Sequence, residues 1–124
     1  QLIYVEQKEI TGTASAIFLA KKIVSENFLV VTGDCYYSQE DIEKCAKYEY
    51  AILVREPNPM LDGGVVLDEN DNVVKILEKE GRSNFCNAGL YKLNKRIFSY
   101  PLEKSVRGEF EITSLLNKLA LDVR

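Results

Sequence analysis

The sequence contains no histidine, so any catalysis must use carboxylates, lysines, arginines, backbone amides or a hard metal ion. A Ser-His-Asp triad, a Cys-His pair and a His-ligated zinc site are therefore excluded. The clearest carboxylate is Asp34, which follows Thr32 and Gly33 after the apolar run 28–31. Ligands of open α/β sheets bind beyond the carboxyl ends of strands, and one carboxylate with phosphate oxygens is a typical Mg²⁺ ligand set. The alternative is an ordinary turn, since Gly and Asp are common turn formers.

A second candidate site is the stretch QKEITGTASA, residues 7–16, where a strand-like segment runs into a helix-like one. The amides of Gly12 and Thr13 lie where the helix should begin, a place where anions or flat polar groups can dock. Gln7 carries both a donor and an acceptor, as recognition of a nucleobase edge requires. The alternative is a plain helix N-terminus capped by Thr11 or Thr13.

Three further polar stretches are candidates: Glu78-Lys79, Asn87-Ala88-Gly89 and Arg107-Gly108-Glu109. Each also has an ordinary structural explanation, as charges at a hairpin edge, a turn, or a loop that leads into a helix. Charged and polar side chains are mostly solvated surface, so none of the three indicates a site by itself.

The first half of the chain alternates between strand-like and helix-like segments. We expect strands at 2–5, 28–31 and 51–54, a helix at 13–24, and a second helix from the capping sequence at 38–41 to about residue 48. This alternation favours parallel strands joined by crossover helices, and the continuous apolar runs predict strands buried on both faces.

The second half has a different pattern. Apolar runs at 65–67 and 73–77 flank Asp68-Glu69-Asn70-Asp71-Asn72, which predicts a β-hairpin. A further strand is expected at about 85–93. Apolar residues at 112, 115, 116, 119 and 123 have helical spacing, so the last element should be an amphipathic helix.

Length and composition limit the possible classes of protein. The 124 residues fit one domain, and the net charge of −3 disfavours nucleic acid or an anionic membrane as a partner. No apolar run approaches the roughly 20 residues that span a bilayer. The three cysteines share no CxxC spacing, so we predict reduced thiols in an intracellular, cytoplasmic protein.

Five stretches occur in order along the chain: QKEITGTASA, VVTGD, GGVVLDENDNVVKILEKE, NAGLYKLNKRIF and RGEFEITSLLN. Together they resemble the sugar-1-phosphate nucleotidylyltransferases, from Gln7 to about Asn117. The resemblance implies a Rossmann-like three-layer α/β/α fold with a mostly parallel mixed sheet plus a β-hairpin, incomplete at both ends. Residues 1–124 would form a single partial domain, with about 1–55 on the nucleotide and metal side and about 56–124 on the sugar side.

The resemblance also implies roles for residues on the nucleotide side. Gln7 would read the edge of the pyrimidine base, and Gly12 and Thr13 would pack against that base. The bare turn would then exist to let the base lie flat against backbone. Asp34 would hold the Mg²⁺ that bridges the phosphates.

On the sugar side the resemblance implies four contacts. The backbone of Gly64 would contact the sugar, and Glu78 would hydrogen-bond sugar hydroxyls. Lys79 would approach the sugar phosphate, and Asn87 would close on the hexose. Arg107 to Thr113 matches a family segment to which we assign no direct chemistry.

The implied reaction makes an NDP-sugar and pyrophosphate from UTP or dTTP and a hexose 1-phosphate, with Mg²⁺ as cofactor and Asp34 and Lys79 as catalytic residues. A sugar 1-phosphate is already an anionic nucleophile, so catalysis needs positioning and charge neutralisation, not a histidine base. Relatives often form homo-oligomers. The family's GxGTRxxPxT loop should lie upstream of residue 1, so we expect residues 1–124 alone to be inactive.

Three alternatives to a working nucleotidylyltransferase remain at this point. The chain could belong to a non-catalytic regulatory or binding subunit that kept the pocket, or be a plain α/β interaction domain that matches the motifs by chance. A GT-A glycosyltransferase is disfavoured because Cys35-Tyr36, not a DxD pair, follows Asp34.

Overall fold

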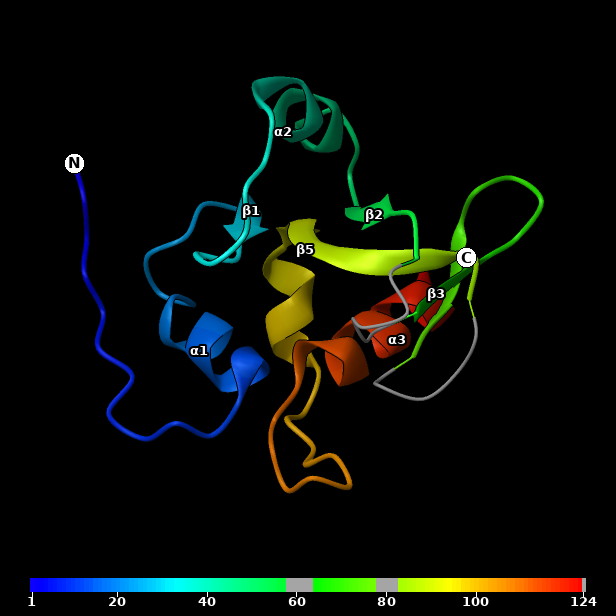
Figure 1. The fold of residues 1–124 in the computed structure, drawn as a ribbon. Helices are drawn as coiled ribbons and strands as arrows, with labels where there is room; N and C mark the ends of the chain where they lie inside the picture. The colour runs from blue at the N-terminus through cyan, green and yellow to red at the C-terminus, as the bar shows by residue number, and fades with distance from the viewer. Residues whose placement is uncertain (58–63, 78–82, 124) are drawn as a thin grey trace.

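The computed structural model describes residues 1–57, 64–77 and 83–123 (Figure 1). In these residues three α-helices, a short 3₁₀-helix and one five-stranded sheet occur. The elements are α1 (Thr13–Leu19), β1 (Asn27–Val31), α2 (Gln39–Ala46), β2 (Ala51–Arg55), β3 (Gly64–Leu67), β4 (Val73–Ile76), β5 (Phe85–Asn94), η1 (Lys95–Ser99) and α3 (Ile112–Asp122). The predicted order of elements is confirmed from α1 onward, and the architecture is α/β.

The sheet is built around β5, and its strand directions differ from the prediction. β5 pairs antiparallel with β1, β2 and β3, and β3 pairs antiparallel with β4. Val30 of β1 and Ile52 of β2 both pair with Tyr91, so β1 and β2 occupy opposite edges of β5 and run parallel to each other. The expected mostly parallel sheet is therefore wrong for the described residues. The α2 crossover keeps β1 and β2 parallel, but β5 is inserted between them (Figure 1).

The strand predicted at residues 2–5 is also not observed. The segment has no regular secondary structure, and the side chains of its four residues are 49–88% exposed. In Figure 1 it runs as an extended blue trace away from the sheet. A strand needs a neighbour for its backbone N–H and C=O groups, and among the described residues no strand pairs with it. High strand propensity alone does not create a strand.

The main core lies between β5, the hairpin and α3. Leu90, Leu93, Ile97, Leu115 and Val65 are the large side chains with the least exposure. The residues of β1 and β2 are only half-buried or exposed, so the prediction that these strands are buried on both faces is wrong.

The helices follow their local sequence signals with one exception. Ser38 caps α2, because its Oγ accepts a hydrogen bond from the Asp41 amide at 3.1 Å, as the capping sequence predicts. α1 ends at Leu19, earlier than predicted, and turns follow it. Val24 still packs against the core from beyond the helix, which explains why the apolar spacing continues past its end.

Asp68 organises the hairpin turn between β3 and β4. Its Oδ1 accepts hydrogen bonds from the amides of Asn70 and Asn72, each at 2.9 Å, and Asp71 has a positive φ of 61°. Such a side-chain-to-backbone turn is what the Asp-Asn composition favours. None of the described helices combines the length and apolar composition needed to cross a bilayer.

We expect Leu90→Ala to lower the free energy of unfolding by about 2–5 kcal/mol, because it leaves a cavity in a closely packed core. Leu90 is 0% exposed, whereas Leu121 on α3 is 65% exposed. The matched control Leu121→Ala should change the free energy of unfolding by less than about 0.5 kcal/mol. Urea titration of both variants measures the difference, and equal losses would contradict this description of the core.

Candidate functional site

The loop after β1 and the Asn87-Ala88-Gly89 segment of β5 lie against each other. The Thr32 amide donates to the Gly89 carbonyl at 3.2 Å. The Tyr37 hydroxyl donates to the Ala88 carbonyl at 2.7 Å and lies 2.7 Å from Thr32 Oγ1. The structure thus brings the neighbourhood of Asp34, predicted for the metal, next to that of Asn87, predicted for the sugar.

Gly89 permits this close approach. Its φ is +78°, and a Cβ at this position would lie 2.5 Å from Thr32 Oγ1 and 3.0 Å from the Tyr37 hydroxyl. Asn87 fixes the same bend, because its Oδ1 accepts from the Gly89 amide at 2.9 Å and its Nδ2 donates to the Tyr91 hydroxyl at 2.8 Å. Asn87 is therefore a half-buried, oriented side chain at this bend.

Asp34 is exposed at the end of this loop. No atom from outside its immediate neighbours lies within 4 Å of a Cβ built on Gly33, and the Asp34 carboxylate is 3.6 Å from the Cys35 Sγ. Within the described residues no three His, Cys, Asp or Glu side chains gather as a metal cage. A lone, accessible carboxylate fits a Mg²⁺ ion that takes its remaining ligands from phosphates and water.

The pKa of Tyr37 is shifted by its surroundings in this loop. Burial raises this pKa above the ordinary 10.0. The hydrogen bond with Thr32 opposes this rise, whereas Cys35 and, to a lesser degree, Asp34 add to it. The neutral hydroxyl is thus favoured, and it is the form that donates to the Ala88 carbonyl.

The turn at Gly12 has an intramolecular reason for being bare. Gly12 has a φ of +123°, and a Cβ there would lie 2.3 Å from the backbone oxygen of Phe110. The Phe110 amide donates to the Thr11 carbonyl and its carbonyl accepts from the Ala14 amide, both at 2.8 Å. The backbone that approaches Gly12 therefore belongs to this same chain. Packing of a nucleobase against the turn stays a prediction.

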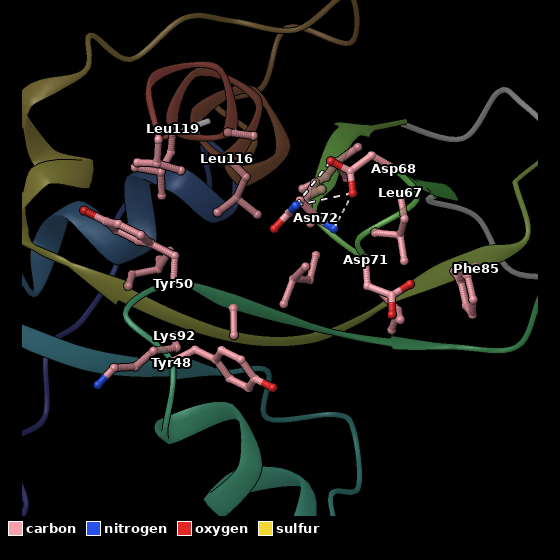
Figure 2. A pocket seen from close by; sticks show the side chains of 18 of the residues that line it. Tyr48, Tyr50, Leu67, Asp68, Asp71, Asn72, Phe85, Lys92, Leu116 and Leu119 are labelled. Atoms are coloured by element: carbon pink, nitrogen blue, oxygen red, sulfur yellow. Dashed lines mark hydrogen bonds between the residues drawn. The ribbon is translucent and has the colours of Figure 1, made fainter.

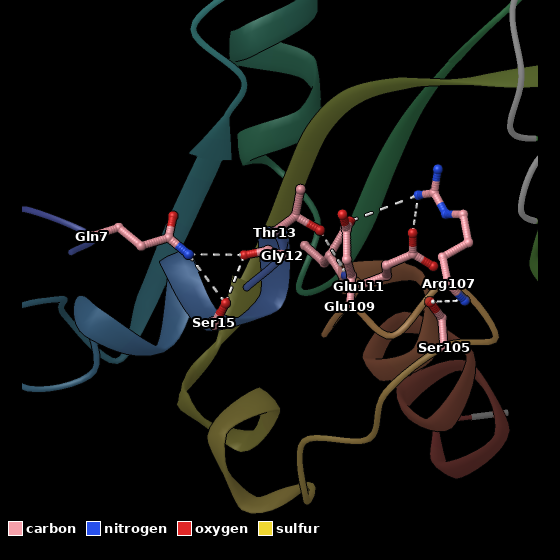
Figure 3. A network of polar contacts seen from close by, with 9 residues as sticks. Gln7, Gly12, Thr13, Ser15, Ser105, Arg107, Glu109 and Glu111 are labelled. Carbon is pink, nitrogen blue, oxygen red and sulfur yellow. Dashed lines mark hydrogen bonds and ion pairs between the residues drawn. The ribbon is translucent and has the colours of Figure 1, made fainter. Parts of the chain in front are cut away.

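Thr13 lies at the start of α1 but caps a different helix. Its Oγ1 accepts a hydrogen bond at 2.9 Å from the amide of Ile112, the first residue of α3 (Figure 3). The N-cap residue of α1 is Gly12, and no side chain caps that end. The alternative that Thr11 or Thr13 caps its own helix is therefore wrong.

Gln7 reaches the same turn from the N-terminal side. Its Nε2 donates to the Gly12 carbonyl and to Ser15 Oγ, both at 3.2 Å (Figure 3). Gln7 also lines a hollow of about 300 Å³ together with Thr11, Ser15 and Leu19. The side chain predicted to read a base thus sits at a small cavity beside the Gly12 turn.

Arg107 and Glu111 form an ion pair that was not predicted from the sequence. Glu111 is only 5% exposed and precedes α3 as its N-cap residue, while Arg107 is partly exposed and also lies 4.0 Å from Glu109 (Figure 3). The signal was the i, i+4 spacing of opposite charges in RGEFE. Sequence could show the pairing but not the burial of Glu111.

The sugar-side candidates are only partly described. Gly64 is buried at the start of β3, pairs with Cys86, and accepts a hydrogen bond from the Leu77 amide at 2.7 Å. A Cβ at Gly64 would lie 2.7 Å from the Ser83 Cβ, so this position requires glycine. Glu78 and Lys79 lie outside the described residues.

The larger cavity, with a volume of about 940 Å³, lies elsewhere. It opens between β2, the β3–β4 hairpin and α3 and is lined by residues such as Tyr48, Asp71, Lys92 and Leu119 (Figure 2). None of the described residues predicted to bind substrate or metal lines it. We therefore place the candidate site at two points: where the loop after β1 meets the bend at Asn87–Gly89 of β5, and at the Gly12 turn. Most of the polar contacts described above lie there.

Gly89→Ala should lower the free energy of unfolding by roughly 2–4 kcal/mol, because a positive φ and the clash with Thr32 both oppose the added methyl. Gly108 is a matched control: its φ is also +78°, but nothing lies within 4 Å of a Cβ built at that position. Gly108→Ala should cost only the backbone strain, about 1 kcal/mol. Chemical unfolding of both variants separates the cost of backbone strain from the cost of the clash with Thr32. Equal costs would mean that the bend does not press on Thr32.

The Tyr37 hydroxyl should make stability depend on pH in the alkaline range. Since the fold raises the pKa of Tyr37, its contribution is complete below pH 10.0 and is lost as the pH rises through the folded value. Tyr37→Phe should cost about 1 kcal/mol at about pH 8 and less at about pH 11. Urea unfolding at the two pH values measures this. Tyr36→Phe, which alters a fully exposed side chain, should show no such change, and a constant Tyr37→Phe difference would refute the coupling.

Comparisons with known proteins identify the family of the chain. Residues 1–123 match the family model described as nucleotidyl transferase. The bifunctional protein GlmU of Methanocaldococcus jannaschii is 43% identical over 122 residues, which cover 94% of this chain and 29% of that protein. The bifunctional sugar-1-phosphate nucleotidylyltransferase/acetyltransferase of Sulfurisphaera tokodaii is 40% identical over 98% of this chain and 32% of its own length. The chain thus spans about a third of these relatives.

Two solved structures share the fold. A putative glucose-1-phosphate thymidylyltransferase from Bacillus anthracis, in complex with a sucrose, has a TM-score of 0.71 and 27% identity, covering 96% of this chain and 52% of that one. A UDP-glucose pyrophosphorylase complexed with UDP-glucose has a TM-score of 0.80 over 98% of this chain and 55% of that one, and its 19% identity shows the fold alone. On the family match and these identities, the chain belongs to the nucleotidyl transferase family.

Proposed function

We propose that the protein containing this chain transfers a nucleotidyl group from a nucleoside triphosphate to a sugar 1-phosphate, releasing pyrophosphate. The observation that carries this proposal is the junction of the Asp34 loop with the Asn87–Gly89 bend, in a chain of the nucleotidyl transferase family. That junction joins a loop that carries an accessible carboxylate to a bend that carries an oriented amide. The two substrates must meet at one place, so such a junction suits their reaction.

The chemistry requires little from the protein beyond positioning. A phosphate oxygen of the sugar 1-phosphate attacks the α-phosphorus of the triphosphate, the new P–O bond forms, and the bond to the β-phosphate breaks with pyrophosphate as leaving group. The nucleophile is already an anion, so no base is needed. This is consistent with a chain that has no histidine.

Asp34 would hold Mg²⁺ against the phosphates, and the ion would offset the charge that develops on them. Lys79 would approach the sugar phosphate as a second catalytic group. Asn87 and the Gly64 backbone would contact the sugar, with Glu78 on its hydroxyls. These roles rest on the family resemblance, and for Asp34 and Asn87 also on the contact between their segments.

Gln7, Gly12 and Thr13 would bind the base, with Gln7 reading its edge across the small hollow beside the turn. A pyrimidine triphosphate, UTP or dTTP, is the substrate we propose, and a hexose 1-phosphate is its partner. The reaction would take place in the cytoplasm, where nucleoside triphosphates are made, and the whole enzyme would be a homo-oligomer, as the resemblance implies.

The full-length protein should release pyrophosphate from UTP or dTTP with a hexose 1-phosphate, and only when Mg²⁺ is present. Asp34→Asn should lower kcat by about 10²-fold, because it removes the charge that holds the ion. The matched control Asp122→Asn alters an exposed carboxylate on α3 and should leave kcat unchanged. A coupled pyrophosphate assay measures both variants, and residues 1–124 alone should give no turnover.

A second outcome would support the alternative. Saturable binding of the nucleotide and hexose phosphate without any pyrophosphate release would indicate a non-catalytic binding subunit of the same family. Absence of both binding and turnover would contradict the proposal.

A further inference from the structure

Asn117 of α3 makes an unusual pair of contacts with the edge of the sheet. Its Oδ1 accepts a hydrogen bond from the Ile76 amide at 2.7 Å, and its Nδ2 donates to the Ile76 carbonyl at 2.9 Å. One side-chain amide thus satisfies both backbone groups of one residue, as a neighbouring strand would. The helix is docked on β4 by this amide as well as by the apolar packing of Ile76, Leu116 and Leu119.

The register of the hairpin shows what this contact holds in place. Ile76 pairs with Val65 of β3, and the next amide, that of Leu77, donates to the Gly64 carbonyl at 2.7 Å. The Ile76 backbone groups that face Asn117 therefore belong to the last paired residues of the hairpin. Asn117 fixes the point where β4 ends against Gly64.

This point is connected to the candidate sugar residues by two short steps. Gly64 pairs with Cys86 of β5, and Asn87 follows Cys86 directly. A shift of the β4 end would move the Gly64 carbonyl and loosen its pairing beside Asn87. On the nucleotide side, Thr13 reaches this connection only through the first residue of α3, Ile112, whereas Asn117 contacts β4 directly.

α3 can hold Asn117 in a fixed place because its first residue, Ile112, is also held by hydrogen bonding. The Ile112 amide is bound by Thr13 Oγ1, and Phe110 just before the helix is bound by the 11–14 turn. Asn117 is five residues further along the same helix. The contacts at the start of α3 therefore fix the position of Asn117, and the hydrogen bonds of Asn117 fix the end of β4.

We infer that Asn117 is a positioning residue for the sugar 1-phosphate, acting through Ile76 and Gly64 without touching the substrate. This role rests on the function proposed above. Removing the amide should disturb the binding of one substrate and leave the other, because Asn117 contacts β4, on the sugar side, directly and reaches the nucleotide side only through Ile112.

The test uses the full-length enzyme and the variants Asn117→Ala, Asn117→Asp and Lys118→Ala. Asn117→Ala should raise the KM for the hexose 1-phosphate about tenfold, the loss expected for about 1.4 kcal/mol of positioning. The KM for the triphosphate should change less than about twofold. Asn117→Asp keeps the acceptor for the Ile76 amide but places a carboxylate oxygen against the Ile76 carbonyl, so its effect should be at least as large as that of Asn117→Ala.

Lys118→Ala is the control, because Lys118 is the next residue of α3 and pairs across the surface with exposed Glu103. It should leave both KM values unchanged. Hydrogen exchange gives a readout that does not depend on activity: the Ile76 amide should exchange faster in Asn117→Ala than in the unaltered protein. Alanine favours helix more than asparagine, so a general loosening of α3 is not the expected cause.

Each result has a distinct meaning. A rise in the hexose 1-phosphate KM alone, with faster Ile76 exchange, supports the inference. Equal changes in both KM values, or none in a folded variant, overturn the role of Asn117 while the proposed function stands. No turnover by the unaltered enzyme overturns the proposed function and this role with it. If the hydrogen-exchange rate of the Ile76 amide is the same in Asn117→Ala, the hydrogen bond between Asn117 and Ile76 does not protect that amide, and the inference is wrong.

Discussion

The contact between the Phe110 backbone and Gly12 is the constraint on which the rest of the structure depends. It joins the first helix to the last through two backbone hydrogen bonds, and Thr13 adds a third by capping α3. Only glycine can occupy that point, since its φ is +123° and no side chain would fit. With α3 fixed at its start, the helix covers β4 and β5 and completes the core. The candidate nucleotide-binding turn and the sugar side are therefore held by one helix.

Local features of the fold were predictable, and long-range pairings were not. The Ser38 cap, the Asp68 turn and the apolar spacing of α3 are encoded within a few residues, so the sequence predicted them correctly. The directions in the sheet depend on β5 inserting between β1 and β2, which no local pattern reports. The segment 2–5 has strand propensity but lacks a neighbour among the described residues, and a strand is defined by its partner.

The candidate site was predictable as a set of residue types but not as an arrangement. Asp34 and Asn87 were proposed from their motifs, and the structure brings their segments together through Thr32 and Tyr37, which no motif had indicated. The bareness of Gly12 was attributed to a ligand, whereas its nearest neighbour is Phe110. The burial of Glu111 and the contacts of the Asn117 amide were not predictable either, because both depend on packing between distant segments.

The hydrogen bond between Thr13 and Ile112 spans 99 residues and therefore orders events during synthesis. The 11–14 turn leaves the ribosome long before its partner exists. At about 5–20 residues per second, the delay is roughly 5–20 s. For that interval the turn and the start of α1 lack the backbone that packs against them. The 11–14 turn therefore gains its packing partner only after α3 has been synthesised, although the turn precedes α3 in the chain.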